Sequence, residues 1–104
     1  MSAIVVTKEN FEEIKNSEKT VLLDFYADWC GPCRMVAPIV AQIAEECPQY
    51  TVGKINVDND PEIARVFNVE SIPLVAFVKN NTYLDMSVGY VPKASLVKKI
   101  EENK

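Results

Sequence analysis

The chain has 104 residues, 48% of them hydrophobic, a size that suits one compact domain spanning residues 1–104 with a single core. Its formal net charge is −4, and the 11 Lys and Arg are mixed among 15 Asp and Glu. Nucleic acid is therefore not an expected partner, because phosphate binding needs clustered cations. The first residues lack a basic signal-like region and no segment approaches membrane-spanning length, so we expect a cytoplasmic protein that does not bind membranes.

The first expected elements are a short β-branched strand at residues 4–6 and a helix that begins near residue 10. Asn10 is a candidate N-cap, and Glu13 follows it at the spacing of a capping box. Thr7 is an alternative cap, so two starting points for this helix remain open.

Residues 20–27 are apolar at almost every position, on both alternating faces of a strand. This pattern predicts a central strand of a parallel sheet, covered by helices on both sides. A helix follows from Gly31 and Pro32, since proline is favoured in a first helical turn. Pro38 lies inside the helical pattern and is expected to kink it, and Pro48 is expected to end it.

A third strand is predicted at residues 51–57, followed by a helix with Pro61 at its first position. The apolar face of this helix is expected to consist of Ile63, Val66 and Phe67. Strands and helices thus alternate through the first two thirds of the chain. This order predicts a βαβαβ unit with parallel strands and right-handed crossovers.

The pattern changes to an antiparallel hairpin in the last third, with strands at residues 74–78 and 83–88. Asn80 and Asn81 tolerate the positive φ angles of a tight hairpin turn. Gly89 breaks the second strand, and a closing amphipathic helix follows. Its apolar residues are Leu96, Val97 and Ile100.

Cys30 and Cys33 lie three residues apart at the start of the second helix, close enough for a disulfide or for a shared metal ion. Zinc and iron–sulfur sites need about four cysteine or histidine ligands. The chain has no histidine and only one further cysteine, Cys47, so a site within one chain lacks a ligand. Cys47 also shares the apolar helix face and is predicted to be a small buried hydrophobe. A metal ion shared by two chains of a dimer remains the alternative to a dithiol that binds no metal.

Redox chemistry fits the pair better, because a helix N-terminus stabilises a thiolate through its free N–H groups and its dipole. Cys30 is furthest out on that terminus and is the expected attacking thiolate. Cys33, one turn further in, is the expected resolving thiol and the less exposed of the two.

Asp24 is a carboxylate among apolar residues on the predicted central strand, so burial should raise its pKa. A carboxyl with a pKa near neutrality can accept a proton, and without histidine Asp24 is the best candidate to take the proton of Cys33. Lys54 lies on the third strand and reaches Asp24 if the two strands are adjacent. The alternatives without a catalytic role are that Asp24 is solvated or salt-bridged at a strand edge and that Lys54 only extends to solvent.

The run Trp29-Cys30-Gly31-Pro32-Cys33, preceded by Asp24 and followed by Pro38, Ile72-Pro73 and Gly89, resembles the thioredoxin family over essentially the whole chain. Two cysteines separated by two residues near a βαβ pattern are typical of thioredoxin-like redox proteins. The resemblance implies an α/β thioredoxin fold, βαβαβ plus ββα, with a mixed five-stranded sheet flanked by four helices.

The resemblance also implies a cis peptide bond at Ile72-Pro73, lying against the dithiol, and a shallow apolar groove that binds an extended substrate peptide. The positions that correspond to this site are Trp29, Gly31, Pro32, Ile72, Pro73, Gly89 and Tyr90. Four positions depart from the family pattern. Leu74 follows Pro73 in place of Thr, Asn81 replaces a glycine, Arg34 replaces Lys, and Tyr26 replaces another aromatic residue.

The implied activity is a thiol–disulfide oxidoreductase that reduces disulfides in target proteins through a reversible Cys30–Cys33 disulfide. Gly31 and Pro32 add no cation between the cysteines, which favours a reductant over an oxidase or isomerase. A separate thioredoxin reductase, dependent on NADPH or ferredoxin, is the expected partner, because the chain has no Gly-rich dinucleotide motif and no bound cofactor is expected. We expect a monomer and a general electron donor. A dedicated partner of one target and a binding module with incidental chemistry are the alternatives.

Overall fold

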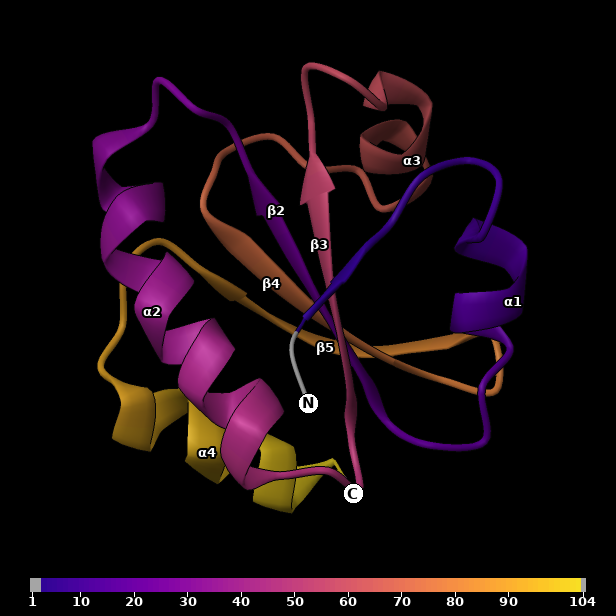
Figure 1. The fold of residues 1–104 in the computed structure, drawn as a ribbon, viewed down its shortest axis with the longest axis vertical. Helices are drawn as coiled ribbons and strands as arrows, with labels where there is room; N and C mark the ends of the chain where they lie inside the picture. Colours follow the sequence, from indigo (N-terminus) through magenta and orange to yellow (C-terminus); the bar gives the residue numbers. More distant parts are fainter. Residues whose placement is uncertain (1–2, 104) are drawn as a thin grey trace.

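The computed structural model describes residues 3–103, within which one mixed sheet has the strand order β1-β3-β2-β4-β5 (Figure 1). The strands are β1 (Ile4–Val5), β2 (Val21–Tyr26), β3 (Thr51–Asn56), β4 (Leu74–Lys79) and β5 (Thr82–Val88). The helices are α1 (Phe11–Lys15), α2 (Gly31–Glu46), α3 (Pro61–Val66) and α4 (Lys93–Glu102). The predicted α/β architecture and order of elements are confirmed.

The apolar strand β2 is the centre of the sheet, as its composition predicts. It runs parallel to β3 and antiparallel to β4, and β1 continues the parallel part beyond β3. Residues 21–25 are all buried, because helices cover both faces of the strand. The last residue, Tyr26, is partly exposed where the strand approaches the loop that leads into α2.

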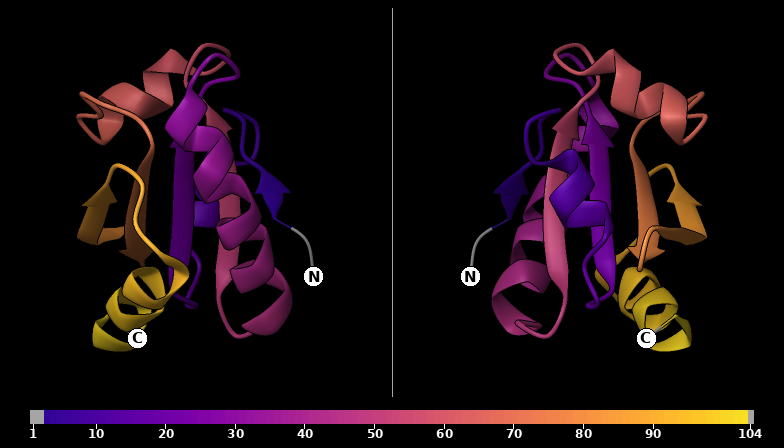
Figure 2. Two further views of the ribbon diagram at one scale, coloured as in Figure 1. Left: turned by 90° about the vertical axis from the view of Figure 1, so that its left-hand side faces the viewer. Right: turned by 90° about the vertical axis from the view of Figure 1, so that its right-hand side faces the viewer.

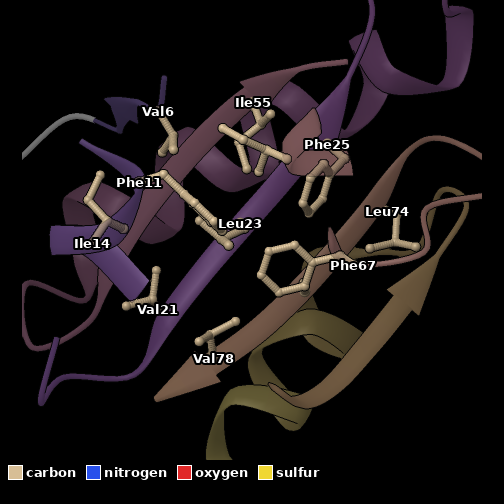
Figure 3. Packing of buried hydrophobic residues seen from close by; sticks show 12 residues of the cluster. Val6, Phe11, Ile14, Val21, Leu23, Phe25, Ile55, Phe67, Leu74 and Val78 are labelled. Atoms are coloured by element: carbon tan, nitrogen blue, oxygen red, sulfur yellow. The ribbon is translucent and has the colours of Figure 1, made fainter. Parts of the chain in front are cut away.

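The sheet separates two layers of helices, with α2 and α4 on one face and α1 and α3 on the other (Figure 2). The face under α1 and α3 carries a cluster with Phe67 at its hub, whose ring lies 5.4 Å from that of Phe25 and 6.0 Å from that of Phe11 (Figure 3). The opposite face buries Leu22 and Phe77 against the apolar sides of α2 and α4. No helix among residues 3–103 is long and apolar enough to cross a bilayer.

Two close backbone approaches explain glycine at particular positions. A Cβ at Gly53 of β3 would lie 2.5 Å from Cγ2 of Val6, so only glycine lets the start of the chain pack here. Gly89 has φ +82, a conformation that side chains rarely adopt, and it ends β5 as predicted. Asn80 and Asn81, with φ of 50 and 64, form the two-residue hairpin turn.

Two local predictions need correction, and a third is not tested. Asn10 occupies the N-cap of α1 without a side-chain capping bond; its amide instead accepts from Thr7 N–H at 2.8 Å and donates to Val5 O at 3.0 Å. Val66 is 61% exposed, because α3 spans only six residues and contacts the sheet side through Ile63 and Phe67. Helix α2 continues through Pro38 as one element, and the kink expected there stays a prediction; as predicted, the helix ends before Pro48.

Candidate active site

Cys30 and Cys33 form a disulfide at the N-terminus of α2, with 5.3 Å between their Cα atoms. Cys30 is the N-cap, and its extended backbone places Sγ to accept a hydrogen bond from the N–H of Cys33 at 3.2 Å. Pro32 lies in the first turn, as its lack of an N–H predicts. The sulfur of Cys30 therefore occupies the position where a helix stabilises negative charge.

The exposed fractions of the two cysteines are almost equal, although Cys33 is predicted to be clearly the less exposed. Cys30 is 4% exposed and Cys33 is 3% exposed, so both are buried in the disulfide form. The distinction between them lies in the hydrogen bond, because the Cys33 N–H donates to the Cys30 sulfur. The division into nucleophile and resolving thiol remains a prediction based on this asymmetry.

The loop before β4 lies against the dithiol. The Ile72-Pro73 peptide bond is cis, as the family resemblance implies, and Ile72 packs on the buried cluster of Ala27, Cys30 and Cys33. The N–H of Gly89 donates to Pro73 O at 2.8 Å and ties the end of β5 to this loop. Residues far apart in the sequence thus meet at one edge of the sheet.

A hollow of about 200 Å³ lies between the Trp29 and Ile72 side chains. Val57, Ala64 and Val69 supply its other apolar walls. Trp29 is 69% exposed, and its Nε1–H donates to Asp58 Oδ2 at 2.9 Å, which holds the indole at the rim. The arrangement offers an apolar surface beside the sulfurs, as a peptide-binding groove requires.

The other predicted groove residues are distributed unevenly around this hollow. Gly31 and Pro32 are exposed at the first turn of α2, next to the disulfide. Tyr90 is exposed one residue beyond Gly89, and it lines neither the hollow beside Trp29 nor the hollow beside Cys33. Its predicted role in substrate binding thus has less geometric support than that of Trp29 or Ile72.

Asp24 is buried in the middle of β2, where its Oδ1 has no hydrogen-bond partner among the described residues. It is paired in register with Lys54 of β3 and with Val75 of β4. Burial raises the pKa of Asp24 from 3.8 to about 6, and the nearby charge of Lys54 partly opposes this rise. A carboxyl with this pKa accepts a proton at neutral pH without a large energetic cost.

Lys54 links Asp24 to the surface near Cys33. Its ammonium lies 4.8 Å from the centre of the Tyr26 ring, and it lines a hollow of about 170 Å³ together with Cys33 and Arg34. Arg34 Nη2 donates to Asp28 O at 2.8 Å, which connects the first turn of α2 to the preceding loop. The adjacency of Asp24 and Lys54 that the sequence analysis required is therefore present.

Replacing Lys54 by methionine should raise the pKa of Asp24 above its parent value of about 6, because the cation that lowers this pKa is lost. The carboxyl carbon resonance of Asp24, followed by NMR against pH in the oxidised protein, measures the change directly. Lys79→Met, at the far end of β4, serves as a control that changes the net charge equally. Equal pKa values in the parent and Lys54→Met would show that Lys54 does not act on Asp24.

The structure also places Cys47, which the sequence predicts to be buried, and Leu74, which departs from the family pattern. Cys47 is a free thiol at the C-cap of α2, only partly buried against the α2–α4 core because the helix ends there. Leu74 is buried in the cluster under α1 and α3, opposite Phe25, and not in the cluster that contains the cysteines. Residues 3–103 contain no group of three or more ligands suited to a metal ion.

Sequence reasoning missed Asp58 and the apolar walls of the hollow beside Trp29. Asp58 follows the end of β3, and Trp29 follows the end of the parallel strand β2, so both lie at the same edge of the sheet. The rule that the carboxyl ends of parallel strands meet at one edge of a sheet could have been applied to the sequence alone. Val57, Ala64 and Val69 carry no comparable signal, because isolated small apolar residues also fit an ordinary core.

Comparisons with known proteins agree with this geometry. A family model described as thioredoxin matches residues 2–102. The chain is 41% identical to a thioredoxin of Chlorobaculum thiosulfatiphilum over 99 residues, covering 93% of this chain and 92% of that protein. It is 43% identical over 100 residues to a chloroplastic M-type thioredoxin of Pisum sativum, covering 94% of this chain and 58% of that protein. A mutant thioredoxin of Halobacterium salinarum superposes with a TM-score of 0.90 at 30% identity, covering 97% and 89% of the two chains.

Proposed function

Because the chain belongs to the thioredoxin family of thiol–disulfide oxidoreductases, with Cys30–Cys33 as its redox-active disulfide, we propose that it is a general reductant of disulfides in other proteins. The observation that carries this proposal is the disulfide at the N-terminus of α2, packed against the cis-Pro loop. A helix N-terminus favours the thiolate that attacks, and the adjacent apolar surface binds the target.

The reaction transfers two electrons to the target. The Cys30 thiolate attacks one sulfur of the target disulfide, which forms a mixed disulfide and releases the first target thiolate. Cys33 then loses its proton, and its sulfur attacks the Cys30 sulfur. The second target thiolate leaves, so the target becomes a dithiol and Cys30–Cys33 becomes a disulfide.

Asp24 is the proposed acceptor of the Cys33 proton, directly or through a water molecule. Its buried carboxylate has an unpartnered oxygen, and its pKa of about 6 leaves it mainly ionised at neutral pH but readily protonated. Lys54 is a positioning residue in this proposal, because it acts on the reaction through the pKa of Asp24.

The proposed groove binds an extended segment of the target across Trp29, Ile72 and the first turn of α2. The apolar hollow between Trp29 and Ile72 receives a side chain of the target next to its disulfide. Pro73 and Gly89 support the groove through the hydrogen bond that joins the two segments. Tyr90 extends it on the far side of Gly89.

A second protein must return electrons to Cys30–Cys33, and we propose a thioredoxin reductase that uses NADPH or ferredoxin. The sequence supports a separate reductase, because it contains no Gly-rich dinucleotide motif. We further propose that the protein works in the cytoplasm, where the reducing environment keeps catalytic cysteines available. The chloroplastic relative shows that a similar chain also serves an organelle.

Replacing Cys33 by serine should stop the reaction at the mixed disulfide, because the thiol that releases the target is missing. Affinity-tagged Cys33→Ser protein, incubated with a lysate and eluted with a reductant, should release many different proteins. Capture of one protein only would instead identify a dedicated partner and contradict the general role.

The matched control for this experiment is Cys30→Ser/Cys33→Ser, which keeps the fold surface but has no active-site thiol. Proteins captured equally by both variants are bound without a disulfide. If Cys33→Ser captures nothing beyond the control, the attack by Cys30 is contradicted and the binding-module alternative gains support.

A further inference from the structure

Among residues 3–103, strand β5 forms one edge of the sheet, where it pairs only with β4. Edge strands are commonly protected by a short length, by charges such as Lys, by Pro or by a β-bulge. At the other edge β1 has two residues, whereas β5 has seven and contains neither Lys nor Pro. Its register with β4 shifts between Phe77 and Val78, but residues 85–88 pair regularly and leave a free edge. We propose that β5 pairs antiparallel with β5 of a second copy of this chain, which joins two sheets across a two-fold axis.

The free edge of β5 offers backbone groups for such pairing. The Met86 N–H donates to Asp85 Oδ1 at 2.8 Å, and the Gly89 N–H donates inward to Pro73 O. Because these groups alternate along an antiparallel strand, the N–H and C=O groups of Met86 and Val88 point away from β4. Pairing exchanges the Asp85 bond of Met86 for a carbonyl of the second copy.

The side chains of β5 match an uncharged apolar partner. Met86 and Val88 are 48% and 51% exposed, and Tyr83 and Leu84 are also exposed. The one charged residue, Asp85, is held within its own chain, because Lys99 Nζ lies 3.1 Å and Asn103 Nδ2 lies 3.2 Å from its Oδ2. An identical strand has this same chemistry, so it approaches without an unpaired charge.

The charge distribution also selects a register. Centring the two-fold axis on Met86 places Met86 opposite Met86, Leu84 opposite Val88 and Asp85 opposite Ser87. This arrangement forms one apolar stripe from both copies. Centring the axis on Asp85 instead places two carboxylates opposite each other, which is destabilising in an antiparallel pair.

A hollow of about 380 Å³ beside this edge provides room for side chains of the second copy. Phe67 at the end of α3 and Tyr83, Leu84 and Met86 of β5 form its apolar walls, and Asn68 and Asp85 are its polar members. Exposed Val66 lines a neighbouring hollow that shares Phe67 and Tyr83. The apolar surface thus extends from the strand edge to Phe67 and Val66 of the α3 region. In the proposed pairing the protein is a dimer, whereas the sequence leads us to expect a monomer.

Sedimentation velocity of the oxidised protein over a wide concentration range tests this proposal. The parent should approach twice the monomer mass at high concentration. Met86→Lys should remain monomeric, because two ammonium groups then face each other at the axis. Val5→Lys, on the opposite edge, should associate like the parent, and both variants should keep disulfide-reductase activity, which shows that they fold.

Amide hydrogen exchange supplies a second readout that needs no variant. The Val88 N–H should exchange more slowly as the concentration rises, because it is protected only in the pair. A parent that stays monomeric at every concentration, or a Met86→Lys variant that associates equally well, would overturn the proposal. So would concentration-independent exchange at Val88, and the edge would then be available for a strand of another protein.

Discussion

Replacing Cys30 by serine should reduce the rate of protein-disulfide reduction to the uncatalysed background. A serine hydroxyl is not ionised at neutral pH and does not form a mixed disulfide, so the first step of the reaction is lost. Reduction of insulin disulfides by equal amounts of prereduced parent and variant measures the effect. Pre-steady-state sampling should detect no insulin–protein adduct with the variant.

Cys47→Ser is the matched control for the Cys30 experiment. Cys47 is a free thiol at the other end of the same helix, so its replacement removes a cysteine without changing the redox pair. The control should reduce insulin at the parent rate. Parent-like activity in Cys30→Ser, or a loss in Cys47→Ser alone, would contradict the assignment of Cys30 as nucleophile.

Replacing Asp24 by asparagine should stabilise the folded protein at neutral pH. The folded state raises the pKa of Asp24 to about 6, above its unfolded value, so folding favours the protonated carboxyl. Below about pH 4, ionisation of Asp24 therefore costs the parent no stability. The free energy of unfolding falls as the pH rises from there through 6, and the loss is complete above it. At about 1.4 kcal/mol per tenfold change, the penalty at high pH is about 3 kcal/mol. Asparagine cannot ionise and should remove this loss.

Urea unfolding of the oxidised proteins between pH 4 and pH 8 measures this difference, because the disulfide prevents Cys30 and Cys33 from titrating. The free energies of unfolding of parent and Asp24→Asn should diverge as the pH rises. Asp85→Asn provides a control of opposite sign. The pKa of Asp85 is lowered, mainly by its hydrogen bond from the Met86 N–H, so its carboxylate stabilises the fold above its ordinary pKa. A parallel pH dependence in parent and Asp24→Asn would contradict the buried-carboxyl argument.

The same substitution separates stability from catalysis. If Asp24 accepts the proton of Cys33, Asp24→Asn should be more stable than the parent yet slower in resolving the mixed disulfide. Such opposite changes identify a residue that is retained for its chemistry at the expense of stability.

Most of the fold was predictable because local patterns and tertiary positions agree along this chain. Residues 21–25 are apolar except for Asp24, which predicts a strand covered on both faces, and β2 is the centre of the sheet. Pro61 marks the start of α3, and Asn80-Asn81 forms the hairpin turn. Val66 was misplaced because a helical period alone does not show how far a short helix extends over its sheet.

The active site was predictable only in part. Cys30 and Cys33 are neighbours in one helical turn, so their proximity follows from spacing alone. The pairing of Asp24 with Lys54 requires β2 and β3 to be adjacent in the sheet. The sequence did not predict this adjacency, so the contact was expected only on the condition that it holds. The roles of these residues remain predictions for the experiments above.

The amino-acid sequence by itself determined the α/β order of elements, the dithiol at a helix N-terminus and the apolar surroundings of Asp24, because each depends on neighbouring residues and local periodicity. Only the tertiary structure decided that Asp58 anchors Trp29, that Ile72 packs on the cluster of Ala27, Cys30 and Cys33, and that β5 leaves an apolar edge unpaired among the described residues. These contacts join segments more than 25 residues apart or depend on strand order. Local sequence patterns do not predict contacts between segments so far apart in the chain. Those contacts depend on the topology of the fold and on packing.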